Sequence, residues 1–194
     1  STLQSNNASD NNSMGRHALM NNTTGEKNVA VGSGAMQNNI VGSSNTALGD
    51  GPMWEQAPGN ENTAVGAYTN PKNTGANRNT TLGVNVNQFN TTGNDNTALG
   101  RKANQHSLST PLTGSNMVAI GNFAGISNID PSNFIAIGSS AGPLGNNYIR
   151  LGNSSITTAA IQVAWSVTSD KRYKKDIKDS NLGLDFIKEL RPVS

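Results

Sequence analysis

Asn28-Val29-Ala30-Val31-Gly32 returns seventeen residues later as Asn45-Thr46-Ala47-Leu48-Gly49. Further copies of this pentad, each again seventeen residues on, lie at 62–66, 79–83 and 96–100, and a degenerate copy lies at 11–15. The glycine then recurs with spacings of 21, 17 and 14 residues, at Gly121, Gly138 and Gly152. A period held over this many copies indicates a repeat protein whose units share a narrow continuous core.

Each pentad predicts a short β-strand. Side chains alternate along a strand, so the residues one and three before the glycine share one face and the central residue lies on the other. The first face is aliphatic or β-branched, and we expect it to form a thin buried seam. The central residue is usually alanine, over which a second chain can pack closely. The aliphatic residues directly before the glycine are Val31, Leu48, Val65, Leu82, Leu99, Ile120, Ile137 and Leu151.

The polar and glycine positions of the pentad predict further stacking. The asparagines should form a hydrogen-bonded amide ladder, as identical amides do along parallel stacks: Asn28, Asn45, Asn62, Asn79 and Asn96. The glycines should end the strands where the backbone needs a positive φ or a close approach: Gly32, Gly49, Gly66, Gly83 and Gly100. A second glycine, in a polar segment that predicts a turn, precedes most pentads: Gly25, Gly42, Gly59, Gly75, Gly93 and Gly114.

We therefore predict an all-β fold, a parallel β-roll or β-solenoid of about nine short coils. With ~4.8 Å between strands, such a stack is roughly 40 Å long. A single coil encloses little apolar volume, so a lone chain should be marginally stable. We expect a homotrimer with threefold symmetry that buries the alanine faces.

The composition excludes several classes of protein. Only 34% of residues are hydrophobic and 13% are charged, with a net charge of +2, which weighs against both an ordinary core and a charged disordered chain. Five of the fourteen lysines and arginines gather at 171–178, and the long preceding part is nearly neutral, so we expect no nucleic-acid partner. The chain has no cysteine, and we find no metal or cofactor motif. No apolar run reaches the ~20 residues that cross a bilayer, so we expect no direct membrane insertion.

Residues 11–152 resemble the head repeats of trimeric autotransporter adhesins, in which tandem Asn-x-Ala-aliphatic-Gly motifs recur. That resemblance implies a left-handed parallel β-roll within a homotrimer. The coils of those adhesins are usually shorter than the period of this chain.

The segments 165–177 and 183–193 resemble the opening of the intramolecular chaperone domain of phage tail fibres and tailspikes, the peptidase S74 family. The resemblance implies a domain that trimerises the preceding fibre and then cuts itself off. It assigns the dyad to Ser169 and Lys174, in which a neutral lysine amine takes the serine proton. Because little of that domain precedes the last residue of this sequence, Ser194, we expect at most a vestigial activity and no cleavage.

These resemblances divide the chain into three parts. We predict a repeat head at 1–152, a neck or linker at 153–168, and the beginning of a chaperone-like domain at 169–194. In the last part, Asn181 is placed to cap a short helix with Leu184, Ile187 and Leu190 at helical spacing.

Receptor contacts are expected where the repeat is interrupted. We predict a surface loop at 50–58, and the enlarged stretch at 102–112 contains His106. Exposed aromatic residues on a rigid scaffold often stack on sugars or enter protein pockets, so Trp54, Tyr68 and His106 are the candidates. The alternative is that Trp54 and Tyr68 only fill corners of the coil or contacts within the trimer.

The sequence thus predicts a structural fibre or adhesin subunit and not an enzyme. The expected partners are two further copies of the chain, other virion or fibre proteins, and a host-surface receptor, either glycan or protein. The expected location is a virion tail fibre or a cell surface. Two alternatives stay open, namely the head of a bacterial trimeric surface adhesin and a fragment of a self-cleaving trimerisation chaperone.

Overall fold

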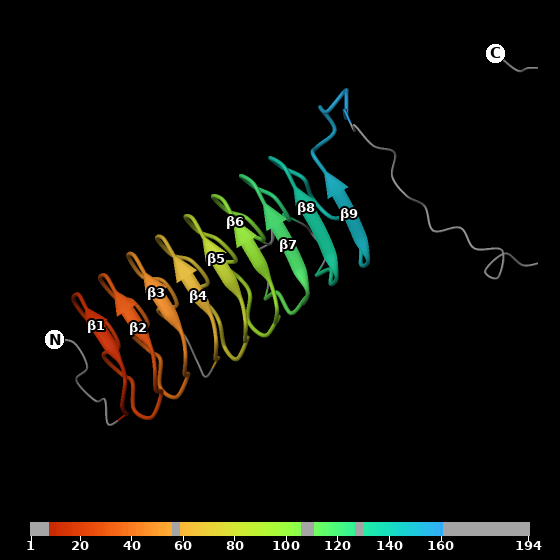
Figure 1. The fold of residues 1–194 in the computed structure, drawn as a ribbon. Helices are drawn as coiled ribbons and strands as arrows, with labels where there is room; N and C mark the ends of the chain where they lie inside the picture. The colour runs from red at the N-terminus through yellow and green to blue at the C-terminus, as the bar shows by residue number, and fades with distance from the viewer. Residues whose placement is uncertain (1–7, 56–58, 106–110, 127–129, 161–194) are drawn as a thin grey trace, which may run out of the picture. The chain divides into compact units, whose positions relative to one another are not determined.

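The computed structural model describes residues 8–55, 59–105, 111–126 and 130–160. Nine short strands follow one another along a single parallel sheet (Figure 1). They are β1 (Asn12–Met14), β2 (Val29–Val31), β3 (Thr46–Leu48), β4 (Thr63–Val65), β5 (Thr80–Leu82), β6 (Thr97–Leu99), β7 (Met117–Ile120), β8 (Phe134–Ile137) and β9 (Tyr148–Leu151). No helix occurs in these described ranges.

The sheet order is the chain order, β1 to β9, so each turn of the chain adds one strand beside the last. Equivalent residues pair: Ala30 lies beside Ala47, and Ala47 beside Ala64. The four extra residues before β7 and the three fewer before β9 leave the strand register unchanged, since Leu99 still pairs with Ile120 and Ile137 with Leu151. The predicted parallel β-solenoid is confirmed.

The prediction of which strand face points into the core is wrong. The central alanines are fully buried inside the coil of a single chain, where Ala30 and Ala47 cluster with Leu19 and Met36. The aliphatic residues point outward, and Leu48 is 46% exposed. The returning segment, which is the part of each coil between one strand and the next, fills the interior with larger side chains. The strand side therefore has room only for small residues, mostly alanine and in β5 Thr81, which is also buried. The alanine faces are therefore not available to another chain.

The returning segment changes the chemistry of the core along the stack. One position in each of the first six coils has a left-handed φ near +50° and a buried side chain. The first three coils place an apolar residue there, and the next three place an asparagine: Leu19, Met36, Met53, Asn70, Asn87 and Asn104. The asparagines bond to one another, with 3.2 Å from Asn87 Nδ2 to Asn70 Oδ1 and 2.8 Å from Asn104 Nδ2 to Asn87 Oδ1. Each of these buried amides therefore has an amide partner in an adjacent coil.

The predicted asparagine ladder is present and buried. Each Oδ1 accepts a hydrogen bond from the backbone N–H of the equivalent residue in the next coil; Asn45 N lies 3.0 Å from Asn28 Oδ1. The Nδ2 of Asn45 donates to Asn28 Oδ1 at 3.2 Å and to the carbonyl oxygen of Gly59 at 2.9 Å. The ladder thus ties each strand both to its neighbour and to the turn before the next strand.

A second buried amide column was not predicted. Asn39 Nδ2 donates to the carbonyl of Gly42 at 2.9 Å, the same oxygen that Asn28 Nδ2 reaches at 2.8 Å. The sequence signal is an asparagine three residues before the second glycine. In the fourth coil the residue equivalent to this second glycine is Ala76 and not Gly75. The carbonyl oxygen of Ala76 accepts the two equivalent hydrogen bonds, from Asn62 Nδ2 and Asn73 Nδ2.

The pentad glycines form a close-packed column. Gly66 has φ +122°, and a Cβ built there would lie 1.8 Å from the carbonyl oxygen of Gly83. Gly32 likewise has φ +124°, and a Cβ built on it would lie 1.7 Å from the carbonyl oxygen of Gly49. Both predicted reasons for glycine, a positive φ and a close backbone approach, therefore apply at this position.

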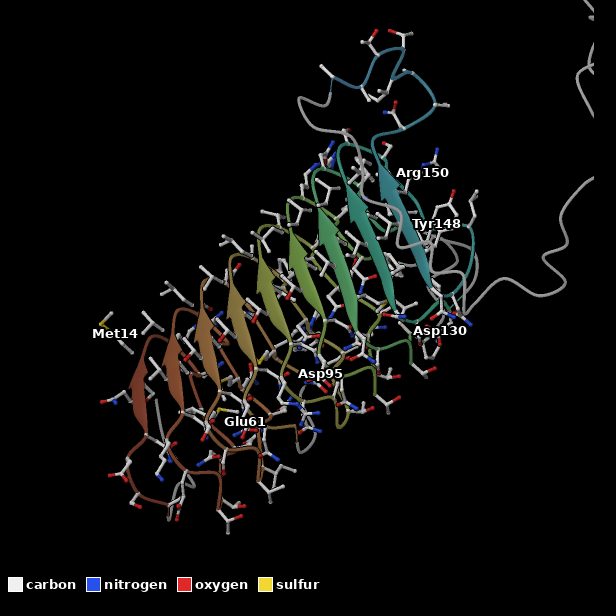
Figure 2. The ribbon with its side chains drawn as sticks, turned by 45° about the vertical axis from the view of Figure 1, so that its right-hand side comes forward. Met14, Glu61, Asp95, Asp130, Tyr148 and Arg150 are labelled. Carbon is white, nitrogen blue, oxygen red and sulfur yellow. The ribbon has the colours of Figure 1, made fainter. Side chains whose placement is uncertain are left out.

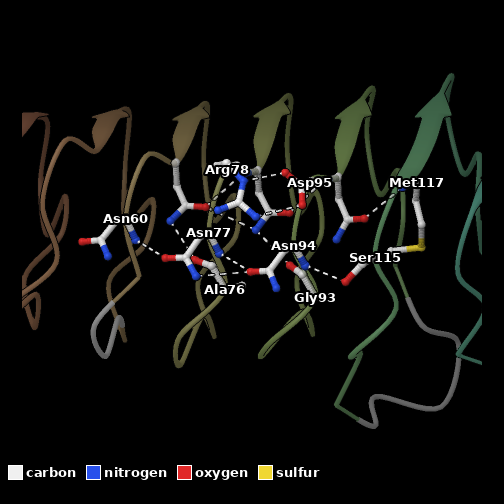
Figure 3. Close-up of polar contacts among 12 residues, drawn as sticks. Asn60, Ala76, Asn77, Arg78, Gly93, Asn94, Asp95, Ser115 and Met117 are labelled. Carbon is white, nitrogen blue, oxygen red and sulfur yellow. Dashed lines mark hydrogen bonds and ion pairs between the residues drawn. The ribbon is translucent and has the colours of Figure 1, made fainter.

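An outer column of small polar side chains joins the turns that precede the strands (Figure 3). Asn77 Oδ1 accepts from the backbone N–H of Asn60 at 2.8 Å, and Asn94 Oδ1 accepts from that of Asn77 at 2.7 Å. Ser115 Oγ continues the column by accepting from the N–H of Asn94 at 2.9 Å. Turns as well as strands are therefore hydrogen-bonded from coil to coil.

Beside this column, Arg78 and Asp95 form an exposed ion pair between adjacent coils (Figure 3). Arg78 Nε and Nη2 donate to the two carboxylate oxygens at 2.7 and 3.0 Å. The hydrogen bond from Arg78 is the main cause that lowers the pKa of Asp95; desolvation opposes it, and the positive charge of Arg78 adds to it. Pairs of this kind contribute little when exposed.

This pair predicts a small, acid-sensitive contribution to stability. Because folding lowers the pKa of Asp95, the contribution is present above the ordinary aspartate pKa of about 3.9 and is lost as the pH falls below it. In a double-mutant cycle with Arg78→Gln and Asp95→Asn, urea unfolding at pH 7 should show a small coupling. The coupling should disappear at about pH 2, and in about 1 M salt, where charges are screened within ~3 Å. A coupling that persisted under both conditions would contradict an electrostatic origin.

The chain divides into two compact units, Ser1–Thr157 and Thr158–Ser194, and the solenoid lies in the first. The second half of the predicted neck, the predicted helix around Asn181, and the dyad of Ser169 and Lys174 lie outside the described residues.

Candidate functional site

A shallow pocket opens on the part of the coil that follows the strands, at the second to fourth coils. Its volume is about 350 Å³. Two exposed aromatic side chains border it, Trp54 and Tyr68, which are 38% and 46% exposed. The lining residues are Ser33, Gly34, Gln37, Asp50, Gly51, Trp54 and Tyr68.

The pocket exists because two successive coils lack a side chain at one repeat position. This position follows the pentad glycine by two residues and has a left-handed φ in every coil. It is occupied by His17, Gly34, Gly51, Tyr68, Asn85, Lys102, Phe123 and Ser140. The two glycines leave a hollow in an otherwise filled column, and Tyr68 closes one end of it.

Gly51 lies between the two aromatic rings. A Cβ built on Gly51 would lie 3.3 Å from Tyr68 Cε1 and 4.0 Å from Trp54 Cδ1. A Cβ on Gly34 would lie 3.6 Å from Gln37 Oε1. Any larger side chain at these two positions would therefore occupy the pocket itself.

Three polar side chains complete the lining. Ser33 supplies a hydroxyl, Gln37 an amide and Asp50 a carboxylate, which together offer both donors and acceptors. No residue in the described part of the chain hydrogen-bonds to these three side chains. Their polar groups are therefore free to bind a ligand.

The backbone around the pocket is held by coil-to-coil hydrogen bonds. Gly51 N donates to Ser33 O at 2.8 Å, and Tyr68 N donates to Asp50 O at 3.0 Å. The carbonyl of Trp54 accepts from Asn38 N at 3.2 Å. The site therefore belongs to the regular scaffold and is preorganised.

The predicted surface loop at 50–58 consists of turns and bends where the structure describes it, at 50–55, and Asp50, Trp54 and Glu55 are exposed, but it does not interrupt the repeat. Residues 50–55 keep the seventeen-residue register, with Met53 buried in the core position that Met36 occupies one coil earlier. Trp54 therefore stands in the position that Gln37 occupies one coil earlier. The structure brings Trp54 and Tyr68 together, whereas His106 lies outside the described residues.

Sequence reasoning missed the other members of the pocket. Gly34, Gly51, Ser33 and Gln37 were not candidates, because each looks like a routine residue of the repeat. A signal was present: when the coils are written beneath one another, only the second and third have glycine where the fourth has Tyr68.

The outward face of the sheet is a second surface of interest. The aliphatic residue that ends each of the strands β1 to β9 is exposed or half-buried, from Met14 at 67% to Leu151 at 56%. Figure 2 shows Met14 projecting away from the first strand. Contiguous apolar surface on this scale often marks an interaction site.

Metal and membrane features are not found in the described part of the chain. There, no group of three or more His, Cys, Asp or Glu residues is placed to hold a metal ion. A search of the described ranges for a helix long and apolar enough to span a bilayer is also negative.

Comparison with known proteins gives no match: no protein family, no curated protein and no solved structure is similar to this chain.

Proposed function

We propose that this chain is a structural subunit of a homotrimeric fibre or adhesin that attaches a virion, or a cell, to a host surface. The observation that carries the proposal is the outward aliphatic face of the solenoid, which runs along all nine strands. The resemblance of the C-terminal segment to the S74 chaperone domain favours the virion fibre over the bacterial adhesin.

The trimer interface in this proposal differs from the one expected from the sequence. Since the alanines are buried within each chain, the three chains would meet through the aliphatic residues of their strands instead. Three such faces around a common axis would remove this surface from water. Burial of apolar area is worth about 25 cal/mol per Å², so a stripe repeated in every coil is a strong driving force for association.

Leu82→Asp is expected to dissociate the trimer. Leu82 ends β5 and is 48% exposed, and a carboxylate there would place three like charges around the axis. The matched control is Val84→Asp, which alters a residue two positions on with 44% exposure but beyond the strand. Native mass spectrometry should give three times 20.2 kDa for the unaltered chain and the control, and 20.2 kDa for Leu82→Asp. A folded monomer for the unaltered chain would refute the trimer.

Attachment itself is tested with fluorescently labelled protein on a panel of bacterial and animal cells. We expect saturable binding by the trimer to at least one cell type and much weaker binding by the Leu82→Asp monomer, because a trimer engages several receptors at once. Equal binding of both forms would remove the link between assembly and attachment.

A further inference from the structure

The Trp54–Tyr68 pocket combines two chemical features that few ligands match together. Trp54 and Tyr68 present flat apolar ring faces on an exposed surface. Ser33, Gln37 and Asp50 present unpartnered hydrogen-bonding groups beside those rings. A ligand must therefore have an apolar face and a polar edge that carries both donors and acceptors.

We infer that this pocket binds a pyranose ring of a β-linked, gluco-configured glycan; the inference rests on the proposed attachment function and names its ligand. In a gluco-configured ring the hydroxyls are equatorial and the C–H bonds are axial, so each face is apolar and the edge is ringed with hydroxyls. The C–H face stacks on the aromatic rings. The hydroxyls donate to Asp50 and exchange hydrogen bonds with Ser33 and Gln37.

Other ligand classes use the pocket less completely. A quaternary ammonium group would use the ring faces and the carboxylate of Asp50, but it would leave the donors of Gln37 and Ser33 unused. An apolar side chain of a protein would desolvate all three polar groups without pairing them, at a cost of affinity. A hydroxylated ring satisfies the aromatic and the polar parts together.

The size of the site agrees with one sugar ring. A volume of about 350 Å³ is at the low end of the range of ~300–1,000 Å³ for small-molecule sites. Since both aromatic residues are more than a third exposed, the pocket is open to solvent and the neighbouring sugars of a chain can extend out of it. We expect a dissociation constant on the order of 1 mM for one site, strengthened by multivalency in an oligomer.

The inference is tested by saturation-transfer NMR on the full chain, with cellotriose as the probe and choline as the cationic alternative. Cellotriose should receive saturation mainly on its axial ring protons. Trp54→Ala should weaken cellotriose binding by at least about tenfold. Tyr148→Ala, which removes an exposed aromatic side chain from β9, is the control and should leave the binding unchanged.

A second variant fills the pocket without altering either ring. Gly51→Asn introduces a residue that this chain already uses at the equivalent position two coils later, Asn85, with φ +54° against +59° for Gly51. The variant should therefore fold, as circular dichroism will show, and should lose cellotriose binding at least as completely as Trp54→Ala. Undiminished binding by folded Gly51→Asn would place the sugar elsewhere.

The outcomes separate this inference from the proposed function. Absence of saturation on cellotriose, or stronger and Trp54-dependent binding of choline, overturns the glycan assignment even if the protein still attaches to cells. Trp54-dependent cellotriose binding upholds the assignment, and failure to attach to any cell would then count against the proposed function alone.

Discussion

Gly66→Ala is expected to lower the free energy of unfolding by about 4 kcal/mol, close to the largest effects seen for single substitutions. Gly66 has φ +122°, a backbone conformation that costs other residues about 1–3 kcal/mol. The added Cβ would lie 1.8 Å from Gly83 O, so one coil must move away from the next. That shift weakens the hydrogen bond between these two coils from Gly83 N to Val65 O, which measures 2.9 Å.

Substitutions at two other glycines separate the cost of the positive φ from the cost of the close contact between coils. Gly34→Ala has a left-handed φ of +65° but no heavy atom within 3.4 Å of its Cβ, so it should cost only about 1 kcal/mol. Gly145→Ala meets nothing within 4 Å and lacks a positive φ, so it should be neutral or slightly stabilising. Urea unfolding followed by circular dichroism, at one fixed protein concentration, measures all three. Equal stability of Gly66→Ala and Gly34→Ala would rule out the close contact.

The repeat period was sufficient to predict the sheet and its register. Identical spacing places Asn45 beside Asn62, and a ladder of buried amides follows from stacking alone. The side of the strand that faces inward did not follow. Alternation defines two faces without saying which is interior, and the usual preference for burying the larger apolar residue selected Leu48 over Ala47. The returning segment determines which face points inward, because its residues Met36 and Met53 already fill the interior and leave space only for the alanine face.

The candidate site was predictable only in part: its two aromatic residues were predicted, and the hollow between them was not. Trp54 and Tyr68 were chosen because exposed aromatic residues on a rigid scaffold often stack on sugars or enter protein pockets, and both do line the pocket. Their proximity depends on the coil register, since Tyr68 lies one coil beyond Gly51 and Gly51 is three residues before Trp54. The hollow itself comes from absent side chains at Gly34 and Gly51, and residue-by-residue inspection for functional groups does not detect an absence.

The largest polar effect is expected for Asn62→Ala in the buried ladder. Asn62 is 1% exposed, and its Nδ2 donates to Asn45 Oδ1 at 3.1 Å and to Ala76 O at 2.9 Å. Its Oδ1 accepts from Asn79 N at 3.0 Å and from Asn79 Nδ2 at 3.2 Å. Truncation leaves the buried N–H of Asn79 without an acceptor, which costs about 1–3 kcal/mol, and a small cavity adds to this. The expected total is about 3–4 kcal/mol in urea unfolding.

Asn60→Ala is the matched control, because Asn60 lies two residues from Asn62 but is exposed to solvent and not buried. Asn60 is exposed, and its Oδ1 accepts a single hydrogen bond of 2.8 Å from Ser43 N. Water can replace that bond, so the loss should stay below about 1 kcal/mol. If the two alanine variants were equally stable, the contribution of the inner ladder would be no greater than that of the outer column.

Asn62→Asp tests whether the donors of the ladder matter as well as its volume. The substitution keeps the shape but directs a carboxylate oxygen toward Asn45 Oδ1 and Ala76 O, both of which are acceptors. Burial and these neighbours should raise the pKa of the new aspartate above its ordinary value of about 3.9, since the protonated form restores one donor. A raised folded-state pKa means that stability is lost as the pH rises. The variant should therefore be markedly less stable than the unaltered chain at pH 7 and recover part of the difference at pH 4. A difference that stayed constant between the two pH values would show that the carboxylate is not buried among acceptors. Equal stability of the variant and the unaltered chain at both pH values would show that the amide ladder is replaceable by any group of the same size.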